Sequence, residues 1–427
     1  MKPPPALVLF PTASRRRWLG LLAVAVLPWL SLSAREQGRS DPASGAGGLT
    51  DEVAARVDDA VHGEMERQGL VGVSVGVLRD GGIAYLRGYG WADCEKKEPA
   101  TVETVYNWAS NSKPLCAVVA MQLVEKGLLD LDADVRRYVP EFPEKEKGVI
   151  TMRHLLSHQS GISHYGDVIP TRRRYREEIP FLDPVLALDS FNLTPLVFAP
   201  GEKVLYSSYA YILASAVVQR VGKEPYHRQI ERRVAGPLGL TSLQLDLEHD
   251  DQPHWAAGYV EDDDGRVVRA KETAHYWKHG AGGYKSHVRD FALWAQALLN
   301  HRLVDAATEA AMWTPQKTRD GEDTNRSLGF TVDGQGGLRV AHGGTQAEAT
   351  SRLVIYPERG HGVVVMTNCG FGDPGAVSTA IYKALNAAPA AEPVADESDP
   401  FRSPTFSGRG TEGMKHEMPS PTALTPP

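Results

Sequence analysis

The sequence predicts an α+β protein in which one antiparallel sheet is assembled from both ends of the chain. A strand pair stands near the start of the folded part, helices fill its middle, and three strands with a final helix close it. Because strands joined by short connections usually pair, the two groups are expected to meet in one sheet, with a helical lobe inserted between them. The cleft between sheet and lobe is then the expected ligand site.

The first predicted element is an amphipathic helix. The stretch TDEVAARVDDAVHGEMERQGL places an apolar residue at every fourth position from Val53 to Met65. Thr50 or Asp51 supplies the cap, and Gly69 ends the helix.

The remaining elements follow from their spacing. VGVSVGVLRDGGIAYLRGYGWAD alternates around Asp80-Gly81-Gly82, which is typical of a β-hairpin. Helical periodicity marks four segments in the middle of the chain: CAVVAMQLVEKGLLDL, MRHLLSHQSG, YAYILASAVVQRVG and VRDFALWAQALLNHR. The segments LRVAHGG, ATSRLVIYPERG and HGVVVMTN are predicted strands, and AVSTAIYKALNAA is the last helix.

Both ends of the chain are expected to lie outside the fold. Residues 1–34 combine three arginines, a short apolar run and the small residues SLSA, as in a secretory signal cleaved near Ser33 or Ala34. The stretch SRRRWLG resembles a bacterial twin-arginine export signal. An uncleaved membrane anchor and an organelle transit peptide are the alternatives.

Composition divides the rest of the chain. Residues 35–50 are predicted to be a flexible linker, 51–388 a single folded domain, and 389–427 a disordered tail rich in proline and serine. The 46 basic and 53 acidic residues give a net charge of -7 without a basic stripe, which argues against nucleic-acid binding. The three cysteines are too sparse for a disulfide scaffold.

The stretch NWASNSKPLC holds a candidate nucleophile. Ser110 and Lys113 are three residues apart, so on a helix the amine can reach the hydroxyl and remove its proton. Pro114 is tolerated only in an opening turn, which places the helix start at Ser110 or Asn111. The lysine must have a lowered pKa to act as a base at neutral pH. An S-x-x-K sequence also arises by chance, so the pair alone decides nothing.

Two further segments carry candidate groups. Tyr206 follows a Pro-Gly turn and precedes an apolar helix, where its phenol can enter the cleft and relay a proton if cations lower its pKa. His342 lies at the end of a strand, and Gly343 and Gly344 leave room for an extended substrate beside that strand. Each has a plainer interpretation, as packing for the tyrosine and as a β-bulge for the glycines.

Together these three elements resemble the serine β-lactamase and penicillin-binding-protein superfamily, and specifically its class C-like branch. The resemblance spans 51–388 and includes ITMRHLLSHQSGISHY and GAGGYKSHVRDFALWAQALL, while RRYVPEFPEKEK is similar to the mitochondrial β-lactamase-like serine protease. It implies the β-lactamase/transpeptidase-like fold, with an antiparallel sheet, flanking helices and a helical lobe. It implies no metal or organic cofactor.

The resemblance assigns roles residue by residue. Ser110 is implied to be the acyl-forming nucleophile and Lys113 its base. In the motif Tyr206-Ser207-Ser208, the phenol is implied to be a second general acid/base.

The strand motif of the family falls on His342-Gly343-Gly344. The implied oxyanion hole consists of the backbone N–H groups of Ser110 and Thr345.

The chain also departs from the family pattern. Ser208 stands where asparagine is common, and Glu348 replaces a glycine. A carboxylate there would repel an anionic substrate or point to solvent. His342 in place of lysine is expected to remove a fixed positive charge at neutral pH. Efficient β-lactam hydrolysis is therefore expected less than cleavage of a peptide or ester.

Histidine spacing raises a metal site as an alternative. His154 and His158 stand four apart, with His164 close behind, but no glutamate completes an H-E-x-x-H motif. We therefore predict no metal. Two function hypotheses remain. The first is an exported serine hydrolase acting on a peptidoglycan-type cell-wall peptide, another peptide or an ester. The second is a catalytically silent relative that binds peptides or forms assemblies.

Overall fold

The computed structural model describes residues 48–164, 182–247, 254–271, 273–334 and 336–387. The predicted export signal, most of the linker and the predicted tail lie outside these residues. Within them, no helix is long and apolar enough to cross a membrane.

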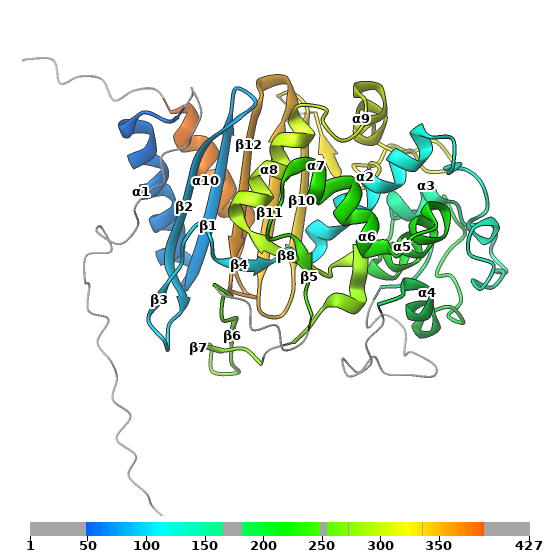
Figure 1. Cartoon of the computed structure of the whole chain (residues 1–427), viewed down its shortest axis with the longest axis horizontal. Coiled ribbons are helices and arrows are strands. Elements are labelled where there is room, and N and C mark those ends of the chain that lie inside the picture. Colours follow the sequence, from blue (N-terminus) through cyan, green and yellow to red (C-terminus); the bar gives the residue numbers. More distant parts are fainter. Residues whose placement is uncertain (1–47, 165–181, 248–253, 272, 335, 388–427) are drawn as a thin grey trace, which may run out of the picture. The chain divides into compact units, whose positions relative to one another are not determined.

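A seven-stranded antiparallel sheet forms the frame of the domain (Figure 1). Its strand order is β3-β2-β1-β12-β11-β10-β9. The strands span Gly72–Arg79 (β1), Gly82–Asp93 (β2), Glu98–Pro99 (β3), Thr331–Asp333 (β9), Arg339–Thr345 (β10), Thr350–Tyr356 (β11) and His361–Thr367 (β12). The β1–β2 hairpin pairs through β1 with β12, from Val73 opposite Thr367 to Leu78 opposite Gly362. The prediction of one α+β sheet built from both ends of the chain is confirmed.

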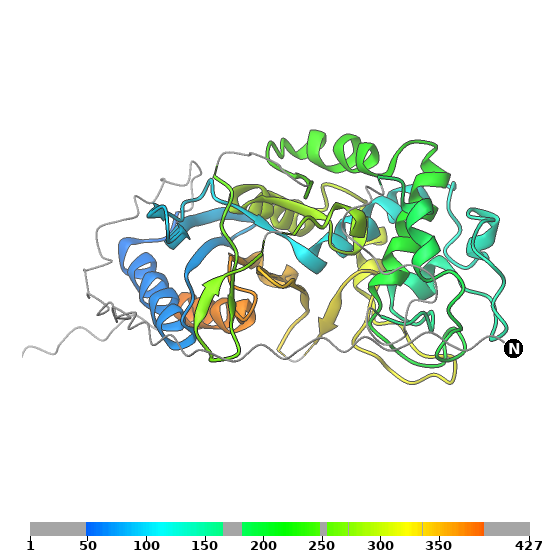
Figure 2. The same ribbon diagram turned by 90° about the horizontal axis from the view of Figure 1, so that it is seen from below.

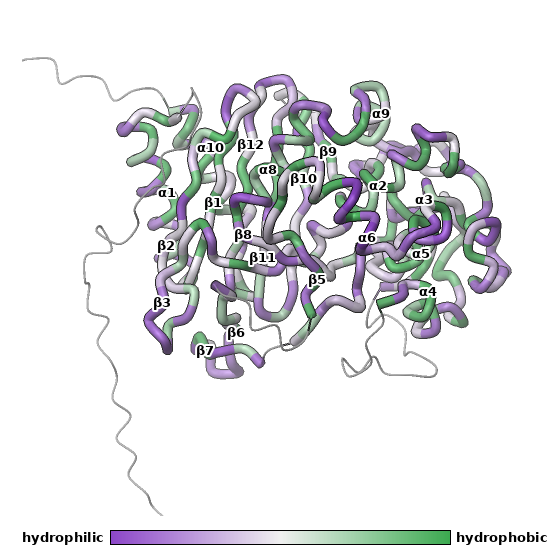
Figure 3. The backbone as a smooth tube through the Cα atoms, viewed as in Figure 1, coloured by the Kyte–Doolittle hydropathy of each residue, from purple (hydrophilic) through white to green (hydrophobic). Residues whose placement is uncertain are grey.

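The two faces of the sheet are covered by different helices (Figures 1 and 2). The terminal helices α1 (Asp51–Gln68) and α10 (Pro374–Asn386) bury Val57 and Ile381 against one face. Thr50 caps α1 and Gly69 ends it in a left-handed conformation, as predicted. Figure 3 shows both apolar and polar residues along α1, as expected for an amphipathic helix.

The opposite face packs against α8 (Val288–Leu299). The prediction that this helix belongs to the helical insert is wrong. Phe291 and Trp294 of α8 are fully buried in the same apolar cluster as Val364 and Met366 of β12. Alternate residues of a strand face opposite sides and helices cover both, so the run Val363–Met366 of β12 is apolar and buried throughout.

The helical lobe is built around α5 (Ser208–Gly222), which packs against α2 (Ser112–Glu125). Its shorter helices are α3 (Met152–Leu156), α4 (Pro184–Ala187), α6 (Tyr226–Ile230) and α7 (Gly236–Leu238). Helix α9 (Ala306–Trp313) contacts α2. Two small sheets complete the described residues, formed by Val105–Asn107 (β4), Gln244–Leu245 (β5) and Tyr284–His287 (β8), and by Tyr259–Glu261 (β6) and Val267–Arg269 (β7).

Candidate active site

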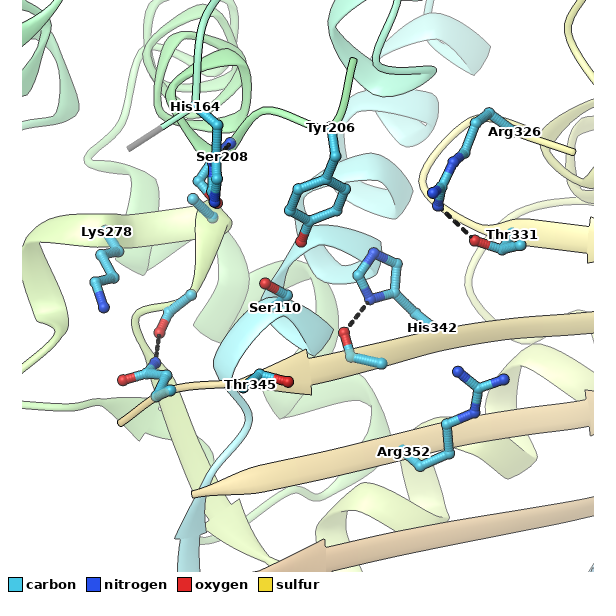
Figure 4. A pocket seen from close by; sticks show the side chains of 14 residues that line it. Ser110, His164, Tyr206, Ser208, Lys278, Arg326, Thr331, His342, Thr345 and Arg352 are labelled. Carbon is cyan, nitrogen blue, oxygen red and sulfur yellow. Dashed lines mark hydrogen bonds between the residues drawn. The ribbon is translucent and has the colours of Figure 1, made fainter. Parts of the chain in front are cut away.

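A pocket of about 640 Å³ lies where the helical lobe meets the sheet (Figure 4). The lobe side contributes Ser110, Tyr206 and Ser208, and strand β10 contributes His342, Gly343 and Thr345. The amine of Lys113 lies 3.0 Å from Ser110 Oγ, and the lysine is completely buried. The structure therefore brings together the predicted nucleophile, base, phenol and imidazole.

Ser110 sits in a strained turn. It belongs to a 3₁₀ turn, Ala109–Asn111, that leads directly into α2 at Ser112. The predicted helix start is thus correct to within two residues. Ala109 has a φ of 48°, a left-handed value that an alanine adopts only when its surroundings enforce it. The turn is held by Ser112, whose Oγ donates to the Ala109 carbonyl at 2.8 Å.

Strand β10 packs directly against this turn at Gly344. A Cβ at this position would lie 2.3 Å from the Trp108 carbonyl oxygen and 2.4 Å from Ser351 Oγ. Ser351 Oγ itself donates to the Trp108 carbonyl at 2.7 Å. Only glycine fits this contact, which sets the distance between the strand and the nucleophile.

Lys113 makes three polar contacts in the interior. Its Nζ lies 3.0 Å from Ser110 Oγ, 3.1 Å from Ser208 Oγ and 2.6 Å from the Ala281 carbonyl oxygen. The carbonyl can only accept, whereas either hydroxyl can donate. A neutral amine has two N–H donors and one lone pair, so it satisfies all three partners when Ser110 donates to it.

The protonation of Lys113 suits this arrangement. Burial, followed by the charge of Lys278, holds the pKa of Lys113 well below its usual value. A lysine with a lowered pKa can accept a proton near neutral pH, which is the condition stated above for Lys113 to act as a base.

The condition stated for Tyr206, a pKa lowered by cations, is not met. Burial raises the pKa of Tyr206 to about 12, although hydrogen bonds with Ser110 and Ser208 and the charge of Arg326 act in the opposite direction. Tyr206 is therefore a neutral phenol at physiological pH, which can donate a proton. Lys113 Nζ lies 4.8 Å from the centre of its ring.

His342 is also neutral. Burial, followed by the charge of Lys113, lowers the pKa of His342 to about 3. Its Nδ1 lies 2.7 Å from the Gly343 carbonyl oxygen.

The strand that carries His342 has an open edge. Strand β10 pairs with β9 only from Arg339 to Ala341. From His342 to Thr345 no other strand of the described chain pairs on that side. An extended ligand can therefore lie alongside this edge of the pocket.

The beta-lactamase family model matches residues 57–388. The chain belongs to this family. It is 27% identical over 431 residues to the human protein named Serine beta-lactamase-like protein LACTB, mitochondrial, covering 77% of this chain and 78% of the human protein. The family resemblance drawn from the motifs is confirmed.

Solved structures of penicillin-binding-protein homologues and amidases share the fold. The octameric penicillin-binding protein homologue from Pyrococcus abyssi has a TM-score of 0.67 and 24% identity, over 78% of this chain and 77% of that one. The D-amino acid amidase from Ochrobactrum anthropi SV3 has a TM-score of 0.65 and 23% identity, over 78% and 98% of the two chains. The predicted β-lactamase/transpeptidase-like fold is thus confirmed.

One departure from the beta-lactamase pattern, Glu348, lies outside the pocket lining. Glu348 was expected to repel an anionic substrate or to point to solvent, and both alternatives are wrong. Its Oε1 lies 2.5 Å from His275 Nε2 and accepts a hydrogen bond from Asn107 Nδ2 at 3.3 Å, with the side chain only 9% exposed. Its Cβ packs against Gly258. The carboxylate is a buried structural group behind the pocket wall.

The neutral His342 agrees with the expected loss of positive charge at that position, but other residues bring positive charge to the pocket. Lys278, Arg326 and Arg352 line it, and no acidic residue does among the described lining residues. Arg352 is not in an ion pair with a described residue, and its Nε is buried without a hydrogen-bond partner. Arg326 donates to Thr331 Oγ1 at 2.7 Å. Because guanidinium groups stay charged at physiological pH, the beta-lactamase pocket of this chain is cationic.

Sequence reasoning missed these cations. Arg352 is directly opposite Gly343 in the sheet register, so strand alternation together with the His-Gly-Gly motif could have pointed to it. Arg326 lies before β9 without any local pattern. Lys278 lies two residues before the glycine-rich segment, whose Ala281 carbonyl accepts from Lys113.

The histidines considered as zinc ligands have other partners. His154 Nδ1 accepts the Thr151 backbone N–H at 3.3 Å, which closes a capping box on α3. His158 and His164 lie near Tyr206. No cluster of potential metal ligands occurs within the described residues.

Proposed function

We propose that this protein is a serine hydrolase that forms an acyl-enzyme on Ser110 and cleaves an amide or ester bond. The observation that carries the proposal is the buried amine of Lys113, 3.0 Å from Ser110 Oγ and with a lowered pKa. A lysine buried without an acidic partner lowers the stability of the fold. Such a residue is therefore typical of a catalytic site, where it activates a nucleophile.

The steps follow from the contacts. Lys113 accepts the Ser110 proton while Ser110 Oγ attacks the substrate carbonyl carbon. The developing oxyanion is stabilised by the backbone N–H groups of Ser110 and Thr345. Tyr206 donates its proton to the leaving nitrogen or oxygen as the scissile bond breaks. The Lys113 ammonium then returns its proton to the Tyr206 phenolate, which restores both groups. Water attacks the acyl carbon and gives one proton to Lys113, and that proton passes to Ser110 Oγ as the acyl group leaves as a carboxylic acid.

We further propose that the leaving group of the substrate carries a carboxylate. In Figure 4 Tyr206 and His342 lie to one side of Ser110, with Arg326 and Arg352 beyond them. Since Tyr206 is the proposed donor to the leaving group, these arginines lie on the leaving-group side. Guanidinium groups are suited to binding a carboxylate. Ser208 still lacks an amide for substrate contacts, so we expect weak β-lactam hydrolysis at most.

Labelling of Ser110 tests the proposed chemistry. A fluorescent penicillin and a fluorophosphonate probe are incubated with the wild type, Ser110→Ala and Ser378→Ala. Ser378 lies on α10 and donates to the Gly375 carbonyl, so it is a matched serine outside the pocket. The proposal predicts labelling of the wild type and Ser378→Ala only. Equal labelling of Ser110→Ala, or no labelling of the wild type by either probe, would refute it.

The carboxylate preference needs paired substrates. Peptides or esters whose leaving groups end in a carboxylate or in a carboxamide differ only in charge. Arg352→Gln is expected to reduce the preference for the carboxylate by about 10- to 100-fold in kcat/KM. Arg339→Gln is the control, because Arg339 lies on β10 and is paired with Asp333 at 2.8 Å. An unchanged preference in Arg352→Gln would contradict the assignment.

The silent, assembly-forming alternative has lost one of its supports. Glu348 was one of its reasons, but that carboxylate does not face the pocket. Ser208, a second reason, contacts the Lys113 amine, and the third was the resemblance of RRYVPEFPEKEK to the mitochondrial-type relatives. The clear outcome favouring the alternative is an unlabelled Ser110 together with light scattering that grows with protein concentration.

We infer export from residues 1–34. The arginines and the apolar run that follows support the inference. Expression in a bacterium with and without twin-arginine transport tests it, with the N-terminus of the recovered protein determined by mass spectrometry. A start near residue 35 only when transport is active is expected, and an intact N-terminus in both strains would exclude a cleaved signal.

A further inference from the structure

Two histidines flank the proposed proton donor. The ring of His158 lies 4.4 Å from that of Tyr206, centre to centre, at an interplanar angle of 33°. The ring of His164 lies 5.5 Å away at 76°, so its edge faces the phenol ring. Both histidines come from the segment that follows α3, more than forty residues before Tyr206 in the chain.

The same histidines bind the backbone on both sides of Tyr206. The backbone carbonyl of His158 accepts the Leu205 N–H at 2.9 Å, and its Nδ1 accepts the Ser207 N–H at 3.1 Å. His164 Nδ1 accepts the next N–H, that of Ser208, at 3.1 Å. Two side chains and one carbonyl thus hold three amides around a single residue.

This pattern fixes the protonation of both rings. A ring whose Nδ1 accepts from an amide must carry its proton on Nε2, because a doubly protonated ring would place an N–H against the amide N–H. Burial holds the pKa of His158 well below its usual value, and the charge of Lys113 acts in the same direction. His158 also adopts a left-handed backbone conformation, with a φ of 61°.

The position of Tyr206 depends on these contacts. Tyr206 lies in the irregular segment before α5, without a helix or strand ladder of its own to orient it. Its hydroxyl is at the far end of a long side chain, so a small backbone rotation displaces it markedly. A displacement of about 1 Å at a reacting group can cost about 10²-fold in rate.

We propose that His158 and His164 are positioning residues for Tyr206, holding its backbone and ring so that the phenol reaches the leaving group. The inference rests on the proposed function, because it assigns the phenol the role of proton donor. It also gives the histidines of the HLLSHQSG segment a role other than metal binding.

Leaving-group dependence tests the proposal. Two esters of the same acyl group are compared, a p-nitrophenyl ester and an alkyl ester. Only the alkyl ester needs a proton donor for its leaving group, because p-nitrophenolate leaves without protonation. The variants are Tyr206→Phe, His158→Phe, which keeps a ring without the acceptor, and His158→Asn, which keeps an acceptor near the Nδ1 position. The matched control is His154→Asn, since His154 also accepts a backbone N–H but lies outside the pocket.

The expected pattern is selective. His158→Phe should lower kcat for the alkyl ester by about 10²-fold and change the p-nitrophenyl ester only a few fold, as in Tyr206→Phe. His158→Asn should recover part of the alkyl-ester activity, and His154→Asn should retain both activities. Equal losses on the two esters in a folded His158→Phe protein would overturn the proposal.

A second measurement is independent of activity. Long-range ¹H–¹⁵N spectra of wild-type protein with labelled histidine report the tautomer of each ring, and His158 and His164 are expected as Nε2–H forms. A protonated Nδ1 on either ring would overturn the proposal. If the wild type hydrolyses neither ester and no probe labels Ser110, the proposed function fails, while the tautomers still decide whether the histidines hold the Tyr206 backbone.

Discussion

Two buried clusters of ionisable groups contact the stretch His275–Ala281, and they are organised in opposite ways. Behind the pocket, Asp246 pairs with Lys285 at 3.7 Å, and Glu348 with His275 at 2.5 Å. In the pocket, Lys113 is equally buried, yet its partners are hydroxyl groups and a carbonyl. Paired charges stabilise a fold, whereas an amine kept without an acid indicates chemistry.

The largest effect is expected from Lys113→Met. It should lower kcat/KM by about 10²- to 10⁴-fold, because the proton acceptor of Ser110 is lost. The free energy of unfolding should fall by no more than about 1 kcal/mol, since no buried carboxylate is left without its partner. Steady-state kinetics and urea denaturation measure the two quantities. If Lys113→Met retained its activity, the unpaired amine could not be interpreted as catalytic, and the two clusters would no longer differ in role.

The opposite outcome is expected for Lys285→Met. The side chain of Lys285 is 1% exposed and lies 4.2 Å from the Trp255 ring centre as well as beside Asp246. Its loss leaves a buried carboxylate and should lower the free energy of unfolding by about 3–5 kcal/mol, with little change in kcat of the folded fraction. A stable protein with lost activity would instead place Lys285 in the catalytic machinery.

Lys278→Gln tests whether the charge of Lys278 sets the pH dependence of activity through the pKa of Lys113. Lys113 must be neutral to act as base, so activity falls as the pH drops through its pKa. The charge of Lys278 helps to lower that pKa, and its removal should shift the acidic limb of kcat/KM upward by up to about one pH unit. Lys317→Gln, at a surface pair with Asp323, should leave the profile unchanged. A downward shift would contradict the assignment of Lys113 as base.

The smallest effect concerns strain beside the nucleophile. Ala109→Gly should raise the free energy of unfolding by up to about 1 kcal/mol, because glycine adopts a φ of 48° without steric cost. Ala310→Gly, at an exposed position of α9, should instead lower it by about 1 kcal/mol. Thermal and urea unfolding of both variants check the signs. Destabilisation by Ala109→Gly would show that the turn carries no relievable strain.

What could be predicted from the sequence depended on local pattern. The hairpin around Asp80 and the position of Ser110 and Lys113 followed from alternation, turn residues and helix spacing, which are properties of neighbouring residues. The burial that raises the pKa of Tyr206, and the pairing of Glu348 with His275, arise from segments far apart in the chain. No local rule contains such contacts. Arg352 is an intermediate case. Its strand was predicted from local pattern, but its place beside the pocket depends on the pairing of β11 with β10, which local pattern does not give.

The pairing of β1 with β12 has a consequence for synthesis. The hairpin made first cannot complete its sheet until residues 361–367, near the end of the domain, have left the ribosome. Until then its β1 edge remains open to other chains. The same closure brings the first and last helices together, with Arg56 Nε donating to the Ala384 carbonyl at 3.2 Å. A circular permutant that joins these helices and opens the chain at an exposed loop should therefore retain the sheet while changing the order in which its strands emerge.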